Sequence, residues 1–228
     1  ATTGAVVMWV RVPTVSTSVD TVIYLWYGNS AISSSQENIT GVWASDYKGV
    51  WHLHDAASPA TDSTSNNNDG TITGAVAATG QINGARDFSG VSQLIDCGSA
   101  ASIDDLGPLT ASAWIKPDAL TTGHRILNKD SAGSGSWIFA ISYTEPTRLQ
   151  LYKSGSTALE RHTVTGSITV GDWQHVMATW DGGTTATNIH LYRNGSELTY
   201  AVTTNGSSLD SDAAESIIIA SRSDKINE

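Results

Sequence analysis

Short extended runs separated by turn-forming residues recur along most of this chain, and this regular spacing of turns constrains its fold more than any other feature. Beyond Asp46 the runs follow one another roughly every 8 to 12 residues, the spacing typical of a β-sandwich or barrel. The clearest turn is Asn194-Gly195, which separates residues 189–193 from 196–200 and predicts a type I′ hairpin. No convincing amphipathic helix exceeds about two turns. The sequence therefore predicts an all-β protein.

Two further extended runs open the chain, at residues 5–13 and 21–29. Apolar side chains fill both runs, and a Ser/Thr-rich segment separates them, so we expect a strand pair. A change of composition near Asp46 marks a boundary. We therefore predict an N-terminal β-hairpin appendage over residues 1–45, the remnant of a preceding domain, and a second domain over residues 46–228. The start at Ala1, without an initiator Met or a signal peptide, indicates a fragment or a processed product.

Charge and hydropathy exclude some classes of partner. The formal net charge is −10, whereas binding to nucleic acid requires a basic surface. No run approaches the roughly 20 apolar residues that span a bilayer, so we expect no membrane insertion. The single cysteine, Cys97, allows no internal disulfide. An acidic surface of this kind suits calcium, neutral sugars or simple solubility.

A set of stretches in a fixed order carries a family resemblance: GVWHLHD (49–55), DSTSNNNDGTITG (62–74), GQINGARDFSG (80–90), LTASAWIKP (109–117), GDWQHVMATWDG (171–182) and IHLYRNGSEL (189–198). Together they resemble the bacterial form of the LamG-like jelly roll in the concanavalin A-like lectin/glucanase superfamily. The resemblance implies a two-sheet antiparallel jelly-roll sandwich in a secreted or cell-surface protein. Residues 1–45 resemble the tail of an uncharacterised bacterial domain that often precedes such modules. By the same resemblance, His175 between Trp173 and Trp180 lies in a sandwich strand and is a scaffold residue.

One departure from the family concerns the end of the chain. Family members usually continue past the strand that matches residues 217–222 into a closing strand, whereas this chain ends at Glu228. The jelly roll would then lack its last strand and present an unpaired edge, which is a site of association in β-proteins. We expect either the N-terminal strand pair or a neighbouring copy of the chain to cover this edge, the second case giving self-association.

The segment 62–70 is dense in oxygen ligands of the kind that hard cations prefer. Asp62, Asn68 and Asp69 are the candidate ligands of a structural Ca²⁺, which the resemblance implies near this loop. A polar hairpin loop without an ion explains the same residues equally well. His52 and His54 share a strand face and could hold a transition metal with Asp55, but we prefer a scaffold role for them.

A sugar site requires an exposed aromatic ring against the apolar face of a pyranose, with polar groups that fix its orientation. The candidates from the central strands are Trp137, Tyr143, Tyr152, Arg125, His124 and Arg161, with Lys129 and His162 nearby. Core packing explains Trp137 and Tyr152 equally well. For Trp114, Trp173 and Trp180 we expect core positions.

Three functions follow as hypotheses. The first is a non-catalytic carbohydrate-binding or adhesion module whose partner is a glycan or polysaccharide. The second is a glycan-active enzyme. The sequence lacks the Glu-x-Asp-x-x-Glu motif of the family's glucanases, which disfavours catalysis, so such an enzyme would need an unconventional carboxylate pair such as Glu160 with Asp130 or Glu145. The third is a structural spacer without a ligand.

Overall fold

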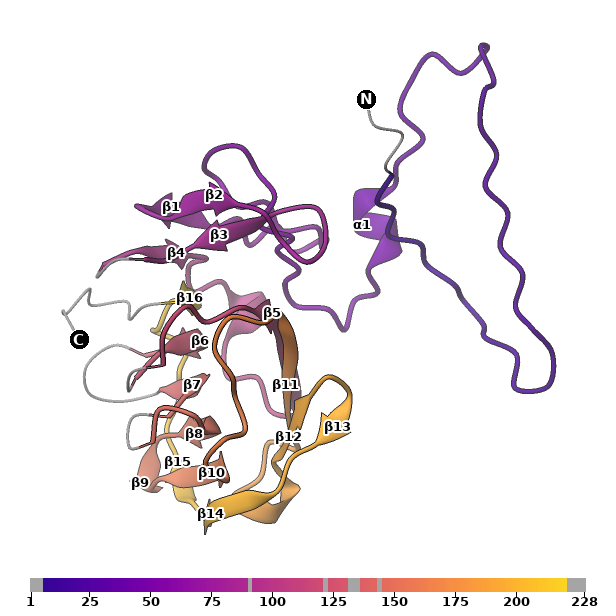
Figure 1. Ribbon diagram of the computed structural model, residues 1–228. Helices are drawn as coiled ribbons and strands as arrows, with labels where there is room; N and C mark the ends of the chain where they lie inside the picture. Colours follow the sequence, from indigo (N-terminus) through magenta and orange to yellow (C-terminus); the bar gives the residue numbers. More distant parts are fainter. Residues whose placement is uncertain (1–5, 90–91, 121–122, 131–135, 143–144, 221–228) are drawn as a thin grey trace.

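The computed structural model describes residues 6–89, 92–120, 123–130, 136–142 and 145–220, and they form an all-β sandwich of two antiparallel sheets (Figure 1). The large sheet has eight strands in the spatial order β1 (Thr71–Thr73), β4 (Leu94–Asp96), β16 (Ile218–Ala220), β6 (Arg125–Lys129), β7 (Trp137–Ile141), β8 (Leu149–Lys153), β10 (Leu159–Thr163) and β14 (Tyr200–Thr204). The small sheet has four, in the order β13 (Ser196–Glu197), β12 (His190–Arg193), β11 (Gln174–Trp180) and β5 (Leu109–Ile115).

Short elements complete the architecture. Two strand pairs lie outside the main sheets: β15 (Ser207–Leu209) with β9 (Gly155–Thr157), and β2 (Val76–Ala78) with β3 (Ala85–Asp87). The helical elements are the single turn α1 (Ile39–Val42) and the 3₁₀ turns η1 (Ala101–Ile103) and η2 (Ala186–Asn188). The predicted all-β sandwich is confirmed.

The core lies between the two sheets and follows the period of two along each strand. In β11, Val176, Ala178 and Trp180 are buried and face the large sheet, whereas His175 and its alternate neighbours are half-buried on the far side. His175 packs its ring against that of Trp114 on β5, with 5.4 Å between the ring centroids. The scaffold role predicted for His175 agrees with this packing. The expected core position of Trp114 was wrong, because this ring points outward and is 41% exposed.

The predicted hairpin at Asn194-Gly195 is confirmed. It joins β12 to β13, and the two turn residues have φ values of 50° and 79°. Positive φ at both positions is the backbone geometry that a type I′ turn requires. The Oδ1 atom of Asn194 also accepts a hydrogen bond from the backbone N–H of His175 at 2.9 Å, which ties the turn to β11.

The N-terminal strand pair is a correction to the sequence-based prediction. Residues 6–38 contain no strand and run out from the sandwich as an extended arm (Figure 1). Within the described residues, the two apolar runs exchange no backbone hydrogen bonds. A two-stranded hairpin is at best marginally stable in water by itself, and no strand of the described residues pairs with these runs. The ring of Trp9 stacks on His52 with 4.8 Å between the centroids, and Arg11 donates to the carbonyl of Gly41 at 3.4 Å.

The strand order also locates the open edges. β16 lies inside the large sheet, between β4 and β6, and so closes it instead of ending it. In the small sheet β5 pairs with β11 on one side, and no described residue pairs with its other side. The expectation that the N-terminal segment covers an open edge was therefore wrong for the described part of that segment.

A group of buried charges fastens one end of the sandwich. The Nζ atoms of Lys129 and Lys153 lie 2.9 Å and 3.0 Å from the two carboxylate oxygens of Asp212. Lys129 also contacts the carboxylate of Asp104 at 2.8 Å and donates to the carbonyl of Ile103 in η1. These contacts compensate the desolvation of the two ammonium groups. Lys129, a neighbour of the predicted sugar site, is thus a structural residue.

Candidate functional site

Polar side chains gather on the face of the large sheet that is turned away from the small sheet, which we call the outer face. Because successive side chains of a strand point to opposite faces, the residues between the core positions lie there. The ladder places one cross-strand row at Asn128, Ile138, Tyr152 and Glu160. A second row beside it holds Arg125, Ala140, Gln150 and His162. Strands β6, β7, β8 and β10 thus bring polar groups from distant parts of the chain together.

Arg125 organises the β6 end of this face. Its guanidinium forms a buried ion pair with Asp130 and donates to Oδ1 of Asn128 at 3.4 Å. Asn128 in turn donates through Nδ2 to the carbonyl oxygen of Ile218 on β16, at 3.2 Å. These contacts fix the side chains of Arg125, Asn128 and Asp130 relative to the sheet.

His162 is the least satisfied group of the outer face. The residue is 7% exposed, yet its Nδ1 atom is buried and finds no hydrogen-bond partner among the described residues. Its Nε2 atom lies 3.7 Å from Oε2 of Glu160. Burial, and to a smaller degree the charge of Arg148, lower the pKa of His162, so the imidazole is neutral at neutral pH. A buried polar atom without a partner costs free energy, and a ligand that supplies the missing hydrogen bond would recover it.

Tyr152 lies between the two ends of the cluster and is half-buried. Burial raises the pKa of its hydroxyl, and the carboxylates of Glu160, Asp130 and Asp210 raise it further. The hydroxyl therefore stays protonated and can both donate and accept hydrogen bonds. The half-exposed ring beside Glu160 is the aromatic surface of this face.

The sequence-predicted sugar residues divide between the two faces of the sheet. Arg125 and Tyr152 lie on the outer face as described. His124 is exposed just before β6, and its carbonyl accepts the backbone N–H of Ile141 at 2.7 Å. Tyr143 lies outside the described residues. The structure thus brings Arg125 and Tyr152 together with Glu160 and His162.

Trp137 and Arg161 are corrections, because both point into the sandwich. Trp137 is 3% exposed and belongs to the core. Arg161 donates to the carbonyl of Ala186 at 2.8 Å, and its guanidinium lies over the ring of Tyr200 at 3.6 Å. Each is one residue away from an outer-face position on its strand, and a step of one residue reverses the face. Neither side chain can contact a ligand on the outer face.

The predictions missed Asn128 and Gln150. Both are polar residues in strands that also contribute side chains to the core, and both share a face with Tyr152. Once the strand pairing is known, counting alternate residues from Tyr152 along each strand identifies both of them. Gln150 is 4% exposed and lies opposite His162 in the ladder.

The predicted calcium ligands form hydrogen bonds that hold their own loop in place. The buried Asp62 accepts hydrogen bonds at Oδ1 from the backbone N–H groups of Val50 and Thr64, both at 2.9 Å. Its Oδ2 atom accepts from the Thr64 hydroxyl at 2.8 Å and from the N–H of Asn68 at 2.9 Å. Asn68 donates through its amide to the carbonyl of Lys48, and Asp69 accepts the N–H of Asp62. Four protein donors thus occupy the two oxygens of the Asp62 carboxylate.

The histidine pair of the sequence prediction is also held by packing. His52 stacks on Trp9, and its ring centroid lies 6.1 Å from that of His54. Burial lowers the pKa of His52, with a further contribution from His54. Among the described residues, no group of three or more His, Cys, Asp or Glu side chains is arranged around a common point as metal ligands are.

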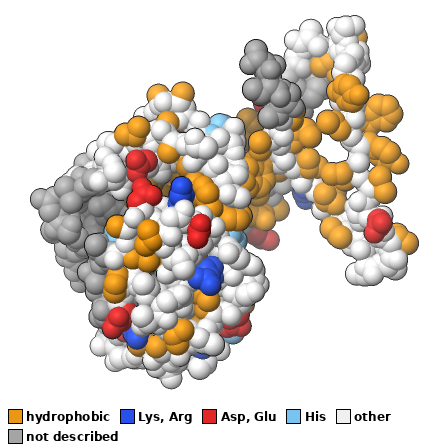
Figure 2. Space-filling view, in the orientation of Figure 1, with side chains coloured by type: hydrophobic (Ala, Val, Ile, Leu, Met, Phe, Trp, Pro, Cys, Tyr) orange, Lys and Arg blue, Asp and Glu red, His pale blue; other side chains and the backbone are white. Residues whose placement is uncertain are grey.

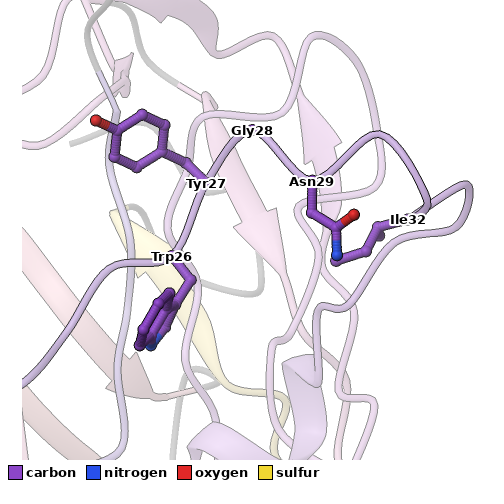
Figure 3. A pocket seen from close by; sticks show the side chains of 5 residues that line it. All are labelled: Trp26, Tyr27, Gly28, Asn29 and Ile32. Atoms are coloured by element: carbon purple, nitrogen blue, oxygen red, sulfur yellow. The ribbon is translucent and has the colours of Figure 1, made fainter.

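Two hollows in the surface lie along the N-terminal arm. The larger, of about 530 Å³, is lined by Trp26, Tyr27, Gly28, Asn29 and Ile32 (Figure 3). Figure 3 shows the rings of Trp26 and Tyr27 directed away from each other. Because the lining comes from one continuous stretch of exposed chain, this hollow lacks the convergent polar groups of a ligand site. The outer face remains the best candidate site.

Comparisons with known proteins agree with the fold. A family model described as the concanavalin A-like lectin/glucanases superfamily matches residues 89–227. Among solved structures, domain 4 of AbnA, a GH43 extracellular arabinanase from Geobacillus stearothermophilus, in complex with arabinotriose, matches with 23% identity and a TM-score of 0.54, covering 70% of this chain and 76% of that one. A native heptameric SAP-like pentraxin from Limulus polyphemus matches with 21% identity and a TM-score of 0.28, covering 52% and 54%.

A search of curated proteins found no match. The comparisons give no support for a preceding bacterial domain in residues 1–45. The likeness to the arabinanase domain shows a shared fold. Since the family model matches more than half of its residues, the chain belongs to the concanavalin A-like lectin/glucanase superfamily.

Proposed function

We propose that this chain is a non-catalytic carbohydrate-binding module and that its glycan ligand lies on the outer face of the large sheet. The observation that carries the proposal is the buried, unpartnered Nδ1 atom of His162 beside the half-exposed ring of Tyr152. Sugar hydroxyls donate and accept hydrogen bonds at once, and a neutral imidazole next to a carboxylate offers the matching pair of groups.

The composition of the face supports a sugar over other ligands. Tyr152 presents an aromatic ring, against which the apolar face of a pyranose or furanose can pack. Gln150, Glu160 and His162 surround it on the ladder and supply donors and acceptors at fixed positions. The solved domain of the arabinanase, which shares this fold, was determined with arabinotriose, and this agrees with a carbohydrate as the class of ligand.

The same contacts disfavour hydrolysis. A glycosidase requires a carboxylic acid that donates a proton and a separate carboxylate that acts as nucleophile or base. In the pair Glu160 and Asp130, the carboxylate of Asp130 is occupied by the ion pair with Arg125. The face therefore suits binding without bond cleavage.

Polysaccharides accumulate outside cells, and we accordingly propose that the module acts in a secreted or cell-surface protein. The arabinanase that contains the similar domain is described as extracellular, which agrees with this location. No described helix is long and apolar enough to cross a membrane.

Binding measurements on paired variants test the proposal. The chain is screened against a panel of polysaccharides and oligosaccharides, and the affinity for the best ligand is measured by calorimetry for Tyr152→Ala and His162→Ala. We expect each substitution to weaken binding about tenfold or more, the equivalent of one good contact. Tyr192→Ala is the matched control, because Tyr192 is a half-buried tyrosine on the far side of the small sheet. A reducing-sugar assay on the same panel should show no release.

Three results would overturn the proposal. The first is the absence of binding to any glycan. The second is equal loss of affinity in Tyr152→Ala and Tyr192→Ala, which would place the ligand elsewhere. The third is release of reducing sugar that Glu160→Gln abolishes, which would make the outer face catalytic. Circular dichroism of each variant establishes that the sandwich is folded.

A further inference from the structure

The N-terminal arm exposes an unusual amount of apolar surface, visible as the hydrophobic side chains along the projecting arm in Figure 2. Tyr24, Trp26 and Tyr27 are 79%, 88% and 90% exposed. At roughly 150 to 250 Å² for a whole aromatic side chain, these three rings alone present roughly 400 to 600 Å². That equals the largest apolar patch of a typical monomer, about 300 to 600 Å², and is at least about half of the roughly 800 Å² that each partner buries in a standard interface.

Residues 22–27, which we call the donor segment, have the pattern of a strand that is buried on both faces. All six side chains, Val22 to Tyr27, are apolar, and their exposed fractions range from 61% to 90%. The backbone of the segment is extended, but no described residue pairs with it in a ladder. Both its side chains and its backbone groups therefore lack the partners that an interior or edge strand obtains.

In the small sheet, β5 has an edge at which an added strand could pair. One side of β5 pairs with β11 along seven residues, and the other side has no ladder partner among the described residues. Ala111 and its alternate neighbours face the core, whereas Trp114 is 41% exposed on the far side. The exposed far side of β5 consists of Thr110, Ser112 and Trp114, so a strand placed beside β5 would contact apolar groups on the core side and the Trp114 ring on the other side. The donor segment, apolar on both faces and close to β5 in length, meets this requirement.

We propose that two copies of this chain associate by reciprocal strand addition, the donor segment of each copy pairing beside β5 of the other. The exchange is isologous, since each copy gives one strand and receives one, and it closes as a dimer. Trp9 stacks on His52 at the base of the arm, so the arm is anchored to its own sandwich while the donor segment projects outward (Figure 1). Each copy carries a formal charge of −10, so added salt screens the repulsion and favours the dimer.

Light scattering coupled to gel filtration tests the proposal on the whole chain. We expect a mass of about 48 kDa, twice the 24.0 kDa of one copy, at high concentration. Leu25→Pro removes a backbone donor from the donor segment and should shift the protein to the monomer. Val19→Pro is the matched control: Val19 is an exposed arm residue outside the donor segment and should leave the dimer intact.

Hydrogen exchange identifies the receiving edge. Backbone amides of residues 22–27 and 109–115 should gain protection together as the dimer forms, and both should lose it in Leu25→Pro. A monomer at all concentrations from micromolar to millimolar would overturn the proposal. A dimer that Leu25→Pro leaves intact, or one that protects an edge other than β5, would overturn it as well. Because the arm is exposed, the thermal midpoints of Leu25→Pro and Val19→Pro should match at dilutions where both variants are monomeric, which separates lost association from lost folding.

Discussion

The Nε2 atom of His162 lies 3.7 Å from Oε2 of Glu160, while the Nδ1 atom of the same ring is buried without a partner among the described residues. Both side chains come from β10 and share the outer face because they are two residues apart. One nitrogen of the imidazole therefore lies near a carboxylate, whereas the other has no hydrogen-bond partner among the described residues. We propose that this asymmetry lets the outer face bind a ligand, and the lowered pKa of His162 makes the stability of the protein depend on pH.

The first prediction concerns that pH dependence. Burial, then Arg148, lower the pKa of His162 below the ordinary value of 6.5, so the unfolded chain takes up a proton before the folded one does. The stability is therefore complete above pH 6.5 and falls as the pH drops from 6.5 toward the lower folded pKa. His162→Gln should reduce the loss of unfolding free energy between pH 7.5 and pH 5, as urea titrations can measure. If the unfolding free energy of the variant depends on pH as steeply as that of the unchanged protein, His162 is not the cause. Some pH dependence should remain in the variant, because the pKa of His52 is also lowered.

A second prediction addresses the buried charges at the end of the sandwich. Asp212→Ala removes the carboxylate that Lys129 and Lys153 share, and both ammonium groups remain buried. Breaking a buried pair of this kind costs about 3 to 5 kcal/mol of unfolding free energy. Chemical denaturation should show a loss of this size, whereas Asp172→Ala, at an exposed position, should cost little. Equal effects of the two substitutions would show that the contacts around Asp212 add no stability.

The third prediction separates core from ligand site. Trp137→Ala should destabilise the sandwich by about 3 to 5 kcal/mol, because it empties a large volume in the core. Tyr152→Ala should cost less, since the ring is half-exposed. Thermal unfolding of the two variants checks the order. A larger loss in Tyr152→Ala would mean that Tyr152 is the main packing residue.

The fourth prediction concerns calcium. The four hydrogen bonds to the Asp62 carboxylate come from the protein itself, so a chelator should leave the melting midpoint unchanged. Asp62→Ala should still destabilise the protein by about 1 to 3 kcal/mol, because it leaves buried donors without acceptors. A midpoint that falls on chelation, and recovers with added Ca²⁺, would establish a metal in this loop.

The sequence was most informative where local pattern and turn chemistry decide the structure. The family resemblance placed His175 in a sandwich strand, which is β11, and Asn194-Gly195 predicted the hairpin that joins β12 to β13, since a tight turn depends only on short-range geometry. The arm shows the limit of the same reasoning. Its apolar alternation equals that of a strand, but a ladder depends on a partner that no local pattern specifies.

The sequence predicted the candidate site only in part, for a related reason. Trp137 lies in the apolar strand β7 and Tyr152 in the mixed strand β8, and sequence alone explained either of them equally well as core or as site. Which face each ring occupies follows from the ladder that pairs Trp137 with Lys153 and Ile138 with Tyr152. The bulge between Arg125 and Leu127 shifts the alternation in β6 and could not be foreseen from the residues.

The position of β16 bears on how the protein is made. Residues 218–220 separate β4 from β6 in the large sheet, yet they come after every other described strand in the chain. Until the ribosome has produced the segment that ends at Ala220, the first two strands of that sheet, β1 and β4, cannot be joined by hydrogen bonds to the remaining five. Synthesis from the N-terminus thus delivers β16 after the other described strands, so the two groups of strands can join only once β16 is available.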